Sequence, residues 1–422
     1  MLPSSEFQFT FRSITTFVAT LYSACIRKHP MPIIPDSEVE ASRALDEEKP
    51  PSSAVFEMVT LCDGCFLGAN KVNCAAPFGS GRRVVYGTDD GIYLSDLREP
   101  NRDPAKVLAL LHVSQVDVLE NYQLLIVLSE HQVITFPLDA LDPLDPMAGL
   151  ERAKRISSHT AFFKVGICLG KVLLCIVKTS PQSSTIKTLE PIDPNTRGRS
   201  KPPFQRLLPG WNDTLQLFRE FYLPVELSSV HFLKTKLCVG CSTGFEIVDL
   251  ESLETQALLD SADASLDFVK KRKRKNHHPM AIYGIHDDFL VCYDEFAFYV
   301  DKNGCRSRQD FMVHWKGSPT GFALRYPFVL AFEPTFVEIR HVETGLVSQV
   351  IQGNNLRLLF SDTMHGYGPQ LQKESPQHPL HAPAGRDEIL MVSDGRVLTL
   401  RPAAGNSHVL SDTTSLASES SR

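Results

Sequence analysis

The sequence predicts an all-β protein, a seven-bladed β-propeller flanked by disordered N- and C-terminal tails. Three observations lead to this fold class. A hairpin-like segment occurs twice, short pairs of apolar runs separated by turn residues recur along the chain, and long helical patterns are nearly absent. Repeated units of several short strands are typical of propeller blades.

The repeated segment occupies Val84–Leu97 and Leu237–Leu250, reading VVYGTDDGIYLSDL and LCVGCSTGFEIVDL. The two glycines of the first copy, Gly87 and Gly91, recur without a gap in the second copy, at an offset of 153 residues (240 − 87). In each copy two apolar runs enclose a turn with a glycine at each end, and glycine is able to take positive φ. An ungapped match of both runs and both glycines indicates an internal repeat.

Five further segments follow the same pattern of apolar run, turn and apolar run. They are Ile126–Phe136, Leu173–Leu189, Phe289–Val300, Phe328–Ile339 and Ile389–Leu400. Two of them lie between the copies of the repeat, so the 153 residues cover three steps of about 51 residues each. The propeller, residues 54–402, then holds about seven steps. We expect a strand near Phe56 to close the ring by pairing with the last blade.

The flanking segments lack this pattern. Residues 1–53 have no sustained hydrophobic period and contain six prolines, so we expect them to be mostly disordered, with a short helix within 13–27. The Ser/Thr-rich segment 403–422 is expected to be a disordered tail. Between Gly210 and Pro224, Asp213–Phe221 shows a short helical pattern, which we interpret as an insertion between blades.

The composition sets limits on function. The chain has 422 residues, of which 43% are hydrophobic and 22% are charged, and its formal net charge is −6. This charge gives no basic field that would attract nucleic acid, and no apolar run reaches the roughly 18 residues needed to span a membrane. The ten cysteines are scattered over expected strands. We therefore expect reduced thiols, a cytoplasmic location and no nucleic-acid partner.

One sequence resembles the motif of a hydrolase nucleophile. Gly240–Gly244 reads G-x-S-x-G, the pattern of a nucleophile elbow, in which the serine lies between a strand and a helix. Here a strand-like run, Phe245–Val248, follows instead of a helix. The repeat also places Asp89 at the position of Ser242. A hairpin turn is therefore the favoured interpretation.

Two CxxC pairs invite a structural zinc site. They are Cys62 with Cys65 and Cys238 with Cys241. In the first copy of the repeat, however, valine and threonine occupy the positions of the second pair. Small buried hydrophobic residues are therefore the favoured interpretation.

The chain offers no visible carrier of catalysis. It contains no P-loop, no H-E-x-x-H and no G-x-G-x-x-G motif that opens a helix. The carboxylate pairs Asp89–Asp90 and Asp287–Asp288 lie in expected turns, and turn formation explains both. We predict no enzyme activity, no catalytic or metal-binding residue and no cofactor.

Six consecutive cations form the run Lys270–Lys275. This run could be a nuclear signal, a patch for phospholipid or nucleic acid, or a solvated loop between blades. The loop is the favoured interpretation, because a strand starts near Ala281. Since no aromatic residue interrupts the run, it offers no stacking platform for single-stranded nucleic acid.

Several longer stretches resemble the citron homology (CNH) domain, most closely the C-terminal CNH domain of fungal Rho guanine-nucleotide exchange factors. These stretches are VYGTDDGIYLSDLREP (85–100), NKVNCAAPF (70–78), YQLLIVLSEHQVITFPLDAL (122–141), RAKRISSHTAFFKVG (152–166), LFREFYLPVE (217–226) and VGCSTGFEIVDL (239–250). The resemblance extends over residues 55–360 and weakens after Ser361. It implies a seven-bladed propeller and a non-catalytic module that binds a Rho-type small GTPase or another signalling protein, with a role in fungal cell-wall integrity.

The resemblance leaves three interpretations of the chain open. In those exchange factors a Dbl-homology domain, which performs exchange, and a pleckstrin-homology domain precede the CNH domain, and residues 1–53 are too few for either. The chain could be a regulatory module on its own. It could instead be a fragment of a full-length exchange factor whose activity lies in the missing part, or a CNH-type vesicle-trafficking adaptor.

Propellers bind partners through their loops, so we take loop residues as candidates for partner binding. These candidates are Asp89, Asp90, Arg98, Lys271, Arg272, Lys273 and Arg274. We further expect that Lys270–Lys275 could contact an anionic membrane, which would place the protein peripherally at the plasma membrane.

Overall fold

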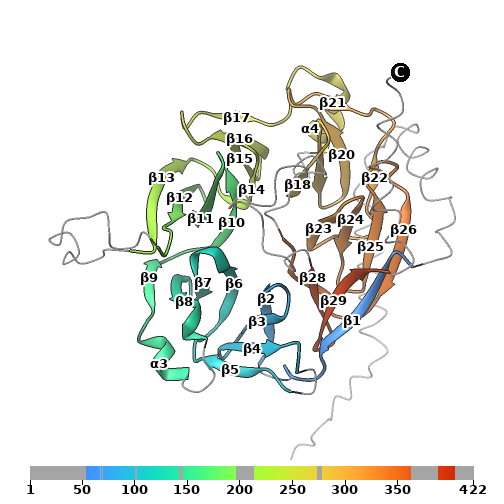
Figure 1. Ribbon diagram of the computed structural model, residues 1–422. Helices are drawn as coiled ribbons and strands as arrows, with labels where there is room; N and C mark the ends of the chain where they lie inside the picture. The colour runs from blue at the N-terminus through green and yellow to red at the C-terminus, as the bar shows by residue number, and fades with distance from the viewer. Residues whose placement is uncertain are drawn as a thin grey trace, which may run out of the picture.

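The strands pair into seven antiparallel sheets arranged around a common axis, as the computed structural model shows face-on in Figure 1. The structure describes residues 54–66, 68, 70–99, 102–141, 146–195, 213–272, 278–362 and 388–403. The predicted seven-bladed β-propeller is confirmed. The predicted disorder of 1–53 and of 404–422 concerns residues outside the described ones.

The first three blades each contain four strands. The first blade consists of β2 (Val72–Phe78), β3 (Arg83–Thr88), β4 (Ile92–Asp96) and β5 (Ala105–Leu108). The second consists of β6 (Val113–Leu119), β7 (Leu124–Ser129), β8 (Gln132–Pro137) and β9 (Lys154–Ser157). The third consists of β10 (Phe162–Cys168), β11 (Lys171–Ser180), β12 (Ser183–Pro191) and β13 (Leu215–Leu223).

The other four blades follow the same plan, with one additional short strand in the fifth. The fourth consists of β14 (Leu227–Phe232), β15 (Lys236–Cys241), β16 (Gly244–Asp249) and β17 (Thr255–Ala257). The fifth consists of β18 (Pro279–Ile285), β19 (Asp288–Tyr293), β20 (Phe296–Val300), β21 (Arg306–Ser307) and β22 (Val313–His314). The sixth consists of β23 (Gly321–Arg325), β24 (Phe328–Phe332), β25 (Phe336–His341) and β26 (Val347–Gln352). The seventh consists of β27 (Arg357–Phe360), β28 (Ile389–Ser393), β29 (Arg396–Pro402) and β1 (Phe56–Cys62).

Helices are few and short in the described part of the chain. They are η1 (Glu120–Tyr122), η2 (Leu138–Ala140), α3 (Pro146–Leu150), η4 (Ala264–Leu266) and α4 (Asp267–Arg272). Among the described residues, no helix combines the length and the apolar composition that crossing a membrane requires.

In each blade, the strand that is named first above is the innermost one, next to the axis of the ring. Contacts run from β2 through β6, β10, β14, β18 and β23 to β27, and β27 in turn contacts β2. Aliphatic side chains fill the space between adjacent blades. Ile126 and Val133 of the second blade, for example, belong to one buried cluster with Phe163 and Leu174 of the third. Each such side chain contributes about 1.5–3 kcal/mol when it is fully buried.

The ring is closed by pairing between segments from the two ends of the fold, as predicted. Strand β1 pairs with β29 in a register that runs from Phe56 opposite Pro402 to Cys62 opposite Val397. Gln349 of β26 joins this closure to the sixth blade. Its side-chain Oε1 accepts hydrogen bonds from the backbone N–H groups of Val55 (2.9 Å) and Phe56 (2.7 Å), and its Nε2 donates to the Phe56 carbonyl (2.9 Å).

The repeated glycine serves close packing between blades. Gly87 and Gly240 occupy equivalent positions at the ends of β3 and β15. A Cβ on Gly87 would lie 2.5 Å from Cys74 Sγ and 2.5 Å from a methyl group of Val113, which begins the next blade. A Cβ on Gly240 would lie 2.3 Å from the hydroxyl oxygen of Ser229. At both positions the second strand passes so close to its neighbours that no side chain fits.

The four glycines of the repeat are all able to take positive φ, but three of them do not. Only Gly244 has a positive φ, of +122°. Gly91 is required by contact instead, since a Cβ there would lie 2.6 Å from the carbonyl oxygen of Leu108. The sequence pattern located the turns correctly. It could not show whether a glycine is needed because its φ is positive or because a Cβ would clash with a neighbouring atom.

The expected helical insertion at Asp213–Phe221 is also wrong. Leu215–Leu223 form β13, the outer strand of the third blade, which pairs with β12 from Leu215 opposite Pro191 to Leu223 opposite Ser184. An isolated helix shorter than about 12–15 residues is marginal in water. The long strand β12 instead offers backbone partners along the whole segment, and this tertiary contribution decides its conformation.

The cysteines divide into one bonded pair and a set of thiols. Cys62 and Cys65 are joined by a disulfide, so the expectation of reduced thiols is wrong for this pair. The other described cysteines are free, and all of them except Cys305 are buried. Burial raises the pKa of Cys74, Cys168 and Cys175 to about 12. These three therefore act as small hydrophobic residues.

Replacing Gln349 by leucine should weaken the closure of the ring. The backbone N–H groups of Val55 and Phe56, both buried residues, lose their acceptor, and an unsatisfied buried donor costs about 1–3 kcal/mol. We expect the urea midpoint to fall by the corresponding amount at an unchanged m-value. Gln352→Leu, at an exposed position of the same strand, is the matched control. Equal midpoints for the two variants would contradict the closing role of Gln349.

Replacing Gly240 by alanine should destabilise the contact between the fourth and fifth blades. Besides the Ser229 hydroxyl, the new methyl group would lie 2.9 Å from the carbonyl oxygen of Pro279, and overpacking typically costs about 1–3 kcal/mol. Thermal and urea unfolding measure this loss. Gly321→Ala serves as control, because a Cβ there makes an ordinary contact of 3.5 Å with Leu358. Equal stability of the two variants would refute the steric explanation.

Candidate functional site

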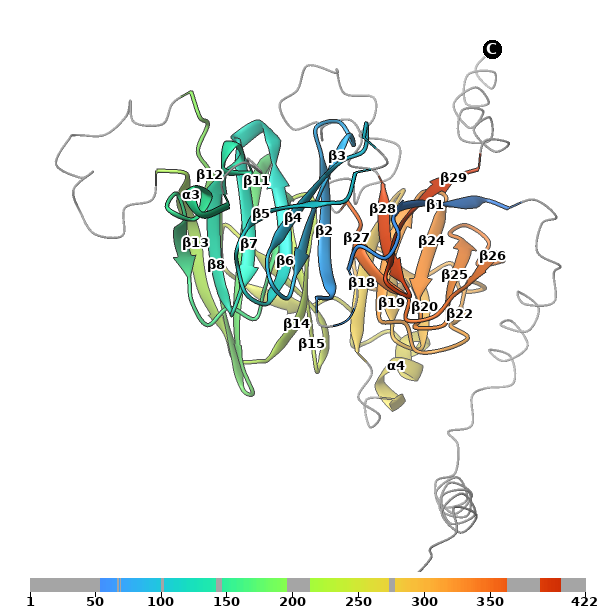
Figure 2. The ribbon, with the colours of Figure 1, turned by 90° about the horizontal axis from the view of Figure 1, so that it is seen from below.

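The two faces of the ring carry different loops. Figure 2 shows the ring from its edge, with α3 on one face and α4 on the other. We call these the α3 face and the α4 face. Because the strands of a blade alternate in direction, the turn between the second and third strands shares the α4 face with the links between blades. The other turns of each blade lie on the α3 face.

The predicted partner-binding residues are divided between the two faces. Asp89 and Asp90 lie in the β3–β4 turn on the α4 face, whereas Arg98 follows β4 and lies on the α3 face. Lys271 and Arg272 end α4, between the fourth and fifth blades, and Lys273 and Arg274 lie outside the described residues. Among the described candidates, Arg98 therefore lies on the other face of the ring from Asp89 and Asp90. Whether any of them binds a partner remains a prediction.

Asp89 and Asp90 have partners within the protein. Asn73 donates a hydrogen bond of 2.8 Å to Asp89, and Lys106 donates one of 3.0 Å to Asp90. Burial alone would raise the pKa of Asp90, but hydrogen bonds from Lys106 and from the Thr88 hydroxyl outweigh this effect and lower it. Both carboxylates thus contribute to the shape of the turn.

Arg98 is held by a carboxylate that belongs to the repeat. Its Nε donates to Asp96 Oδ1 at 2.8 Å, and this interaction holds the pKa of the Asp96 carboxyl well below its ordinary value. Oδ2 of Asp96 also lies 3.7 Å from Nε of Arg83 on the neighbouring strand β3. In the second copy of the repeat Asp249 and Lys236 form the equivalent ion pair at 3.5 Å. In these two blades the aspartate at the end of the third strand therefore has a structural role.

The G-x-S-x-G sequence and the two CxxC pairs lie in strands and turns of the blades. Gly240–Gly244 forms the hairpin turn between β15 and β16, which confirms the turn interpretation. The two CxxC pairs lie apart. Cys62 ends β1 of the seventh blade and Cys65 follows it, whereas the other pair lies in β15 of the fourth blade. No group of three or more metal-ligating side chains occurs among the described residues.

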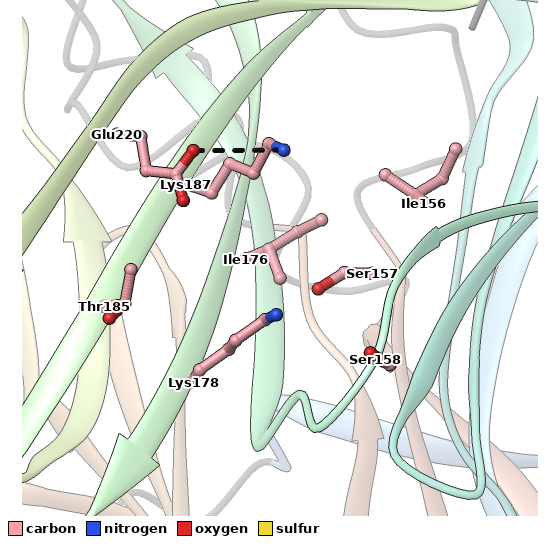
Figure 3. A pocket seen from close by; sticks show the side chains of 8 residues that line it. All are labelled: Ile156, Ser157, Ser158, Ile176, Lys178, Thr185, Lys187 and Glu220. Carbon is pink, nitrogen blue, oxygen red and sulfur yellow. Dashed lines mark ion pairs between the residues drawn. The ribbon is translucent and has the colours of Figure 1, made fainter. Parts of the chain in front are cut away.

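A pocket lies between the second and third blades. It has a volume of about 190 Å³ and is lined by Ile156, Ser157, Ser158, Ile176, Lys178, Thr185, Lys187 and Glu220. Figure 3 shows both lysine side chains reaching from the sheet of the third blade into the gap, with the Lys178 nitrogen facing Ser157 and Ser158. The register of β11 and β12 places Lys178 opposite Thr185 and Ile176 opposite Lys187, so all four lie on one face of the sheet.

The charges of this pocket are only partly balanced. Lys187 Nζ lies 4.0 Å from Glu220 Oε2, at the limit of an ion pair. Within the described part of the chain Lys178 forms no ion pair. Sequence reasoning missed both lysines. The alternation of the predicted Leu173–Leu189 hairpin could have placed them on one face, but no sequence signal shows that β9 of another blade forms the opposite wall.

The inner strands also carry titratable groups. Lys164 of β10 and His231 of β14 are half-buried near the axis of the ring. Burial lowers the pKa of Lys164 in spite of the nearby carboxylates of Asp117 and Asp362. Burial and the Lys164 charge lower the pKa of His231 to about 3. His231 is therefore neutral in the native protein, with its Nε2 3.1 Å from the Ser229 hydroxyl.

Comparison with protein families finds a match to one domain family. The CNH domain profile matches residues 80–362. The solved structure titled "AfRom2 CNH domain" has a TM-score of 0.66 and a sequence identity of 40%, and the match covers 82% of this chain and 98% of that chain.

The similar curated proteins are longer than this chain. Rho1 guanine nucleotide exchange factor 1 of Schizosaccharomyces pombe is 50% identical over 309 residues, which are 72% of this chain and 23% of that protein. RHO1 GDP-GTP exchange protein 2 of Saccharomyces cerevisiae is 32% identical over 326 residues, 73% of this chain and 23% of that protein. Human citron Rho-interacting kinase is 24% identical over 287 residues, 64% of this chain and 13% of that protein. The chain thus spans less than a quarter of the length of these three relatives.

The depressed pKa of His231 makes stability sensitive to acid. Between the ordinary value of 6.5 and about 3, the unfolded chain binds a proton that the native protein does not. Native stability is therefore lost as the pH falls through this window. We expect His231→Gln to show a smaller loss in urea unfolding between about pH 6.5 and 4.5. His278→Gln, at an exposed position, is the control. A wild-type acid dependence in H231Q would contradict the assignment.

Proposed function

Because this chain belongs to the CNH domain family, we propose that it is a non-catalytic interaction module of Rho-type small GTPase signalling. The observation that carries this proposal is its 50% identity to a Rho1 guanine nucleotide exchange factor, over 72% of the chain. The similarity to citron Rho-interacting kinase, a protein of a different class by its name, supports the same GTPase family. The shared element would then be a module for Rho-type partners and not an enzymatic centre.

Nucleotide exchange is assigned to other parts of those relatives in this proposal. The match includes 23% of the S. pombe factor, and the CNH domain profile accounts for residues 80–362 of this chain. The described part of this chain supplies a rigid ring whose loops can present a binding surface on either face. In this proposal the protein acts in the cytoplasm, peripherally at the plasma membrane, with Lys270–Lys275 facing anionic lipids.

Binding and exchange assays with the purified chain test the two parts of the proposal. We expect it to bind an immobilised Rho-type GTPase in the GDP-loaded or the GTP-analogue-loaded state. We also expect the release of mant-GDP from the same GTPase to keep its uncatalysed rate. A Ras-type GTPase is the matched control for binding. Failure to bind any Rho-type GTPase in either state would overturn the proposed partner, and accelerated mant-GDP release would overturn the non-catalytic role.

A further inference from the structure

The pocket between the second and third blades concentrates positive charge in a partly enclosed space. Lys178 and Lys187 both reach into it, and Glu220 is the one carboxylate among its lining residues (Figure 3). Arg155 of β9 is exposed and precedes the lining residue Ile156 in the sequence. Lys154, the other cation of that strand, is paired with Asp213. The lining side chains therefore leave an excess positive charge for a ligand.

The remaining lining residues suit a ligand with several acceptor oxygens. Ser158 and Thr185 place hydroxyl groups at the pocket, while the Ser157 hydroxyl accepts a hydrogen bond from Thr160 at 3.1 Å. Ile156 and the buried Ile176 contribute apolar surface. Apolar surface lowers the local dielectric constant and so strengthens the attraction between the ammonium groups and an anion.

We propose that this pocket binds a phosphoryl group carried by a phosphorylated serine or threonine of a partner protein. A phosphorylated side chain carries a charge of about −1.5 to −2 and three strong acceptor oxygens, which match two ammonium groups and neighbouring hydroxyls better than a single carboxylate does. Lysine binds phosphate as a point charge and needs no fixed planar geometry. The inference stands apart from the proposed function, because it does not require that the partner be a GTPase.

A peptide is favoured over a free anion because apolar side chains are exposed next to the pocket. Tyr222 of β13 lies opposite Thr185 and is 62% exposed. Leu217 of the same strand is 57% exposed. These two side chains offer apolar contact surface on the strand that carries Glu220, which a peptide can use and a free anion cannot. They would contact residues that flank the phosphorylated side chain.

The two walls of the pocket are held in place by a contact between blades. The Gln115 side chain of β6 accepts a hydrogen bond from the Phe163 N–H (2.7 Å) and donates one to the Phe163 carbonyl (3.2 Å) of β10. This amide fixes the second blade relative to the third. The ligand therefore meets a preformed site and does not have to order it, which favours affinity.

Titration with short peptides tests the proposal. The probes are a fluorescein-labelled pentapeptide with a central phosphoserine flanked by leucines, the same peptide with serine or glutamate, and inorganic phosphate as competitor. Fluorescence polarisation should report binding of the phosphoserine peptide, about tenfold weaker binding of the glutamate peptide and none of the serine peptide. We expect Lys178→Gln and Lys187→Gln each to weaken binding of the phosphoserine peptide about tenfold. Glu220→Gln should strengthen it, because it removes a like charge.

Lys171→Gln is the matched control. It makes the same change in charge on β11, but Lys171 pairs with Glu190 outside the pocket. We expect wild-type affinity for K171Q and unchanged thermal stability for all four variants, so that a loss of binding cannot be ascribed to unfolding. Three results would overturn the proposal: no binding of the phosphoserine peptide, equal loss in K171Q and K178Q, or binding of free phosphate alone, which would make the pocket a site for an adventitious ion only.

Discussion

The fold depends on the backbone pairing of β1 with β29, which closes the ring. Each blade buries the faces of its sheet against two neighbours, so an open ring would expose a sheet face to water. The closing strand comes from the start of the described part of the chain, and Gln349 secures it by three hydrogen bonds to Val55 and Phe56. The contact between the sixth and seventh blades therefore involves a segment almost 300 residues away in sequence.

Equal spacing of the blades imposes the second constraint. The end of each second strand must pass its own inner strand and the beginning of the next blade, and at Gly87 and Gly240 this passage leaves no room for a Cβ. A separate contact explains why Asp96 and Asp249 recur, since each forms an ion pair with a cation on the neighbouring strand of its own blade. The glycines and aspartates shared by the two copies of the repeat are therefore explained by close packing and ion pairing, and they do not indicate a ligand.

Local pattern predicted most of the fold because the blades are built from hairpins whose strands adjoin in sequence. The seven blades, the turns at Gly87–Gly91 and Gly240–Gly244 and the closure near Phe56 all follow from alternation and spacing. The prediction failed at β13, whose conformation is decided by β12 across a long connection. It also failed to find the pocket of Lys178 and Lys187. Its opposite wall comes from another blade, and the contact between blades leaves no periodic trace in the sequence.

The side chains of Gln115 and Gln349 show how a pocket can be held between the sheets of two adjacent blades. Gln115 joins the second blade to the third at Phe163, as Gln349 joins the sixth to the seventh at Phe56, each with hydrogen bonds to both backbone groups of one residue. A side-chain amide satisfies both groups only when the blades keep one separation. That separation sets the width of the gap into which Lys178 and Lys187 reach. The recognition chemistry of the pocket is therefore a consequence of ring geometry, and its charge can change while the fold is retained.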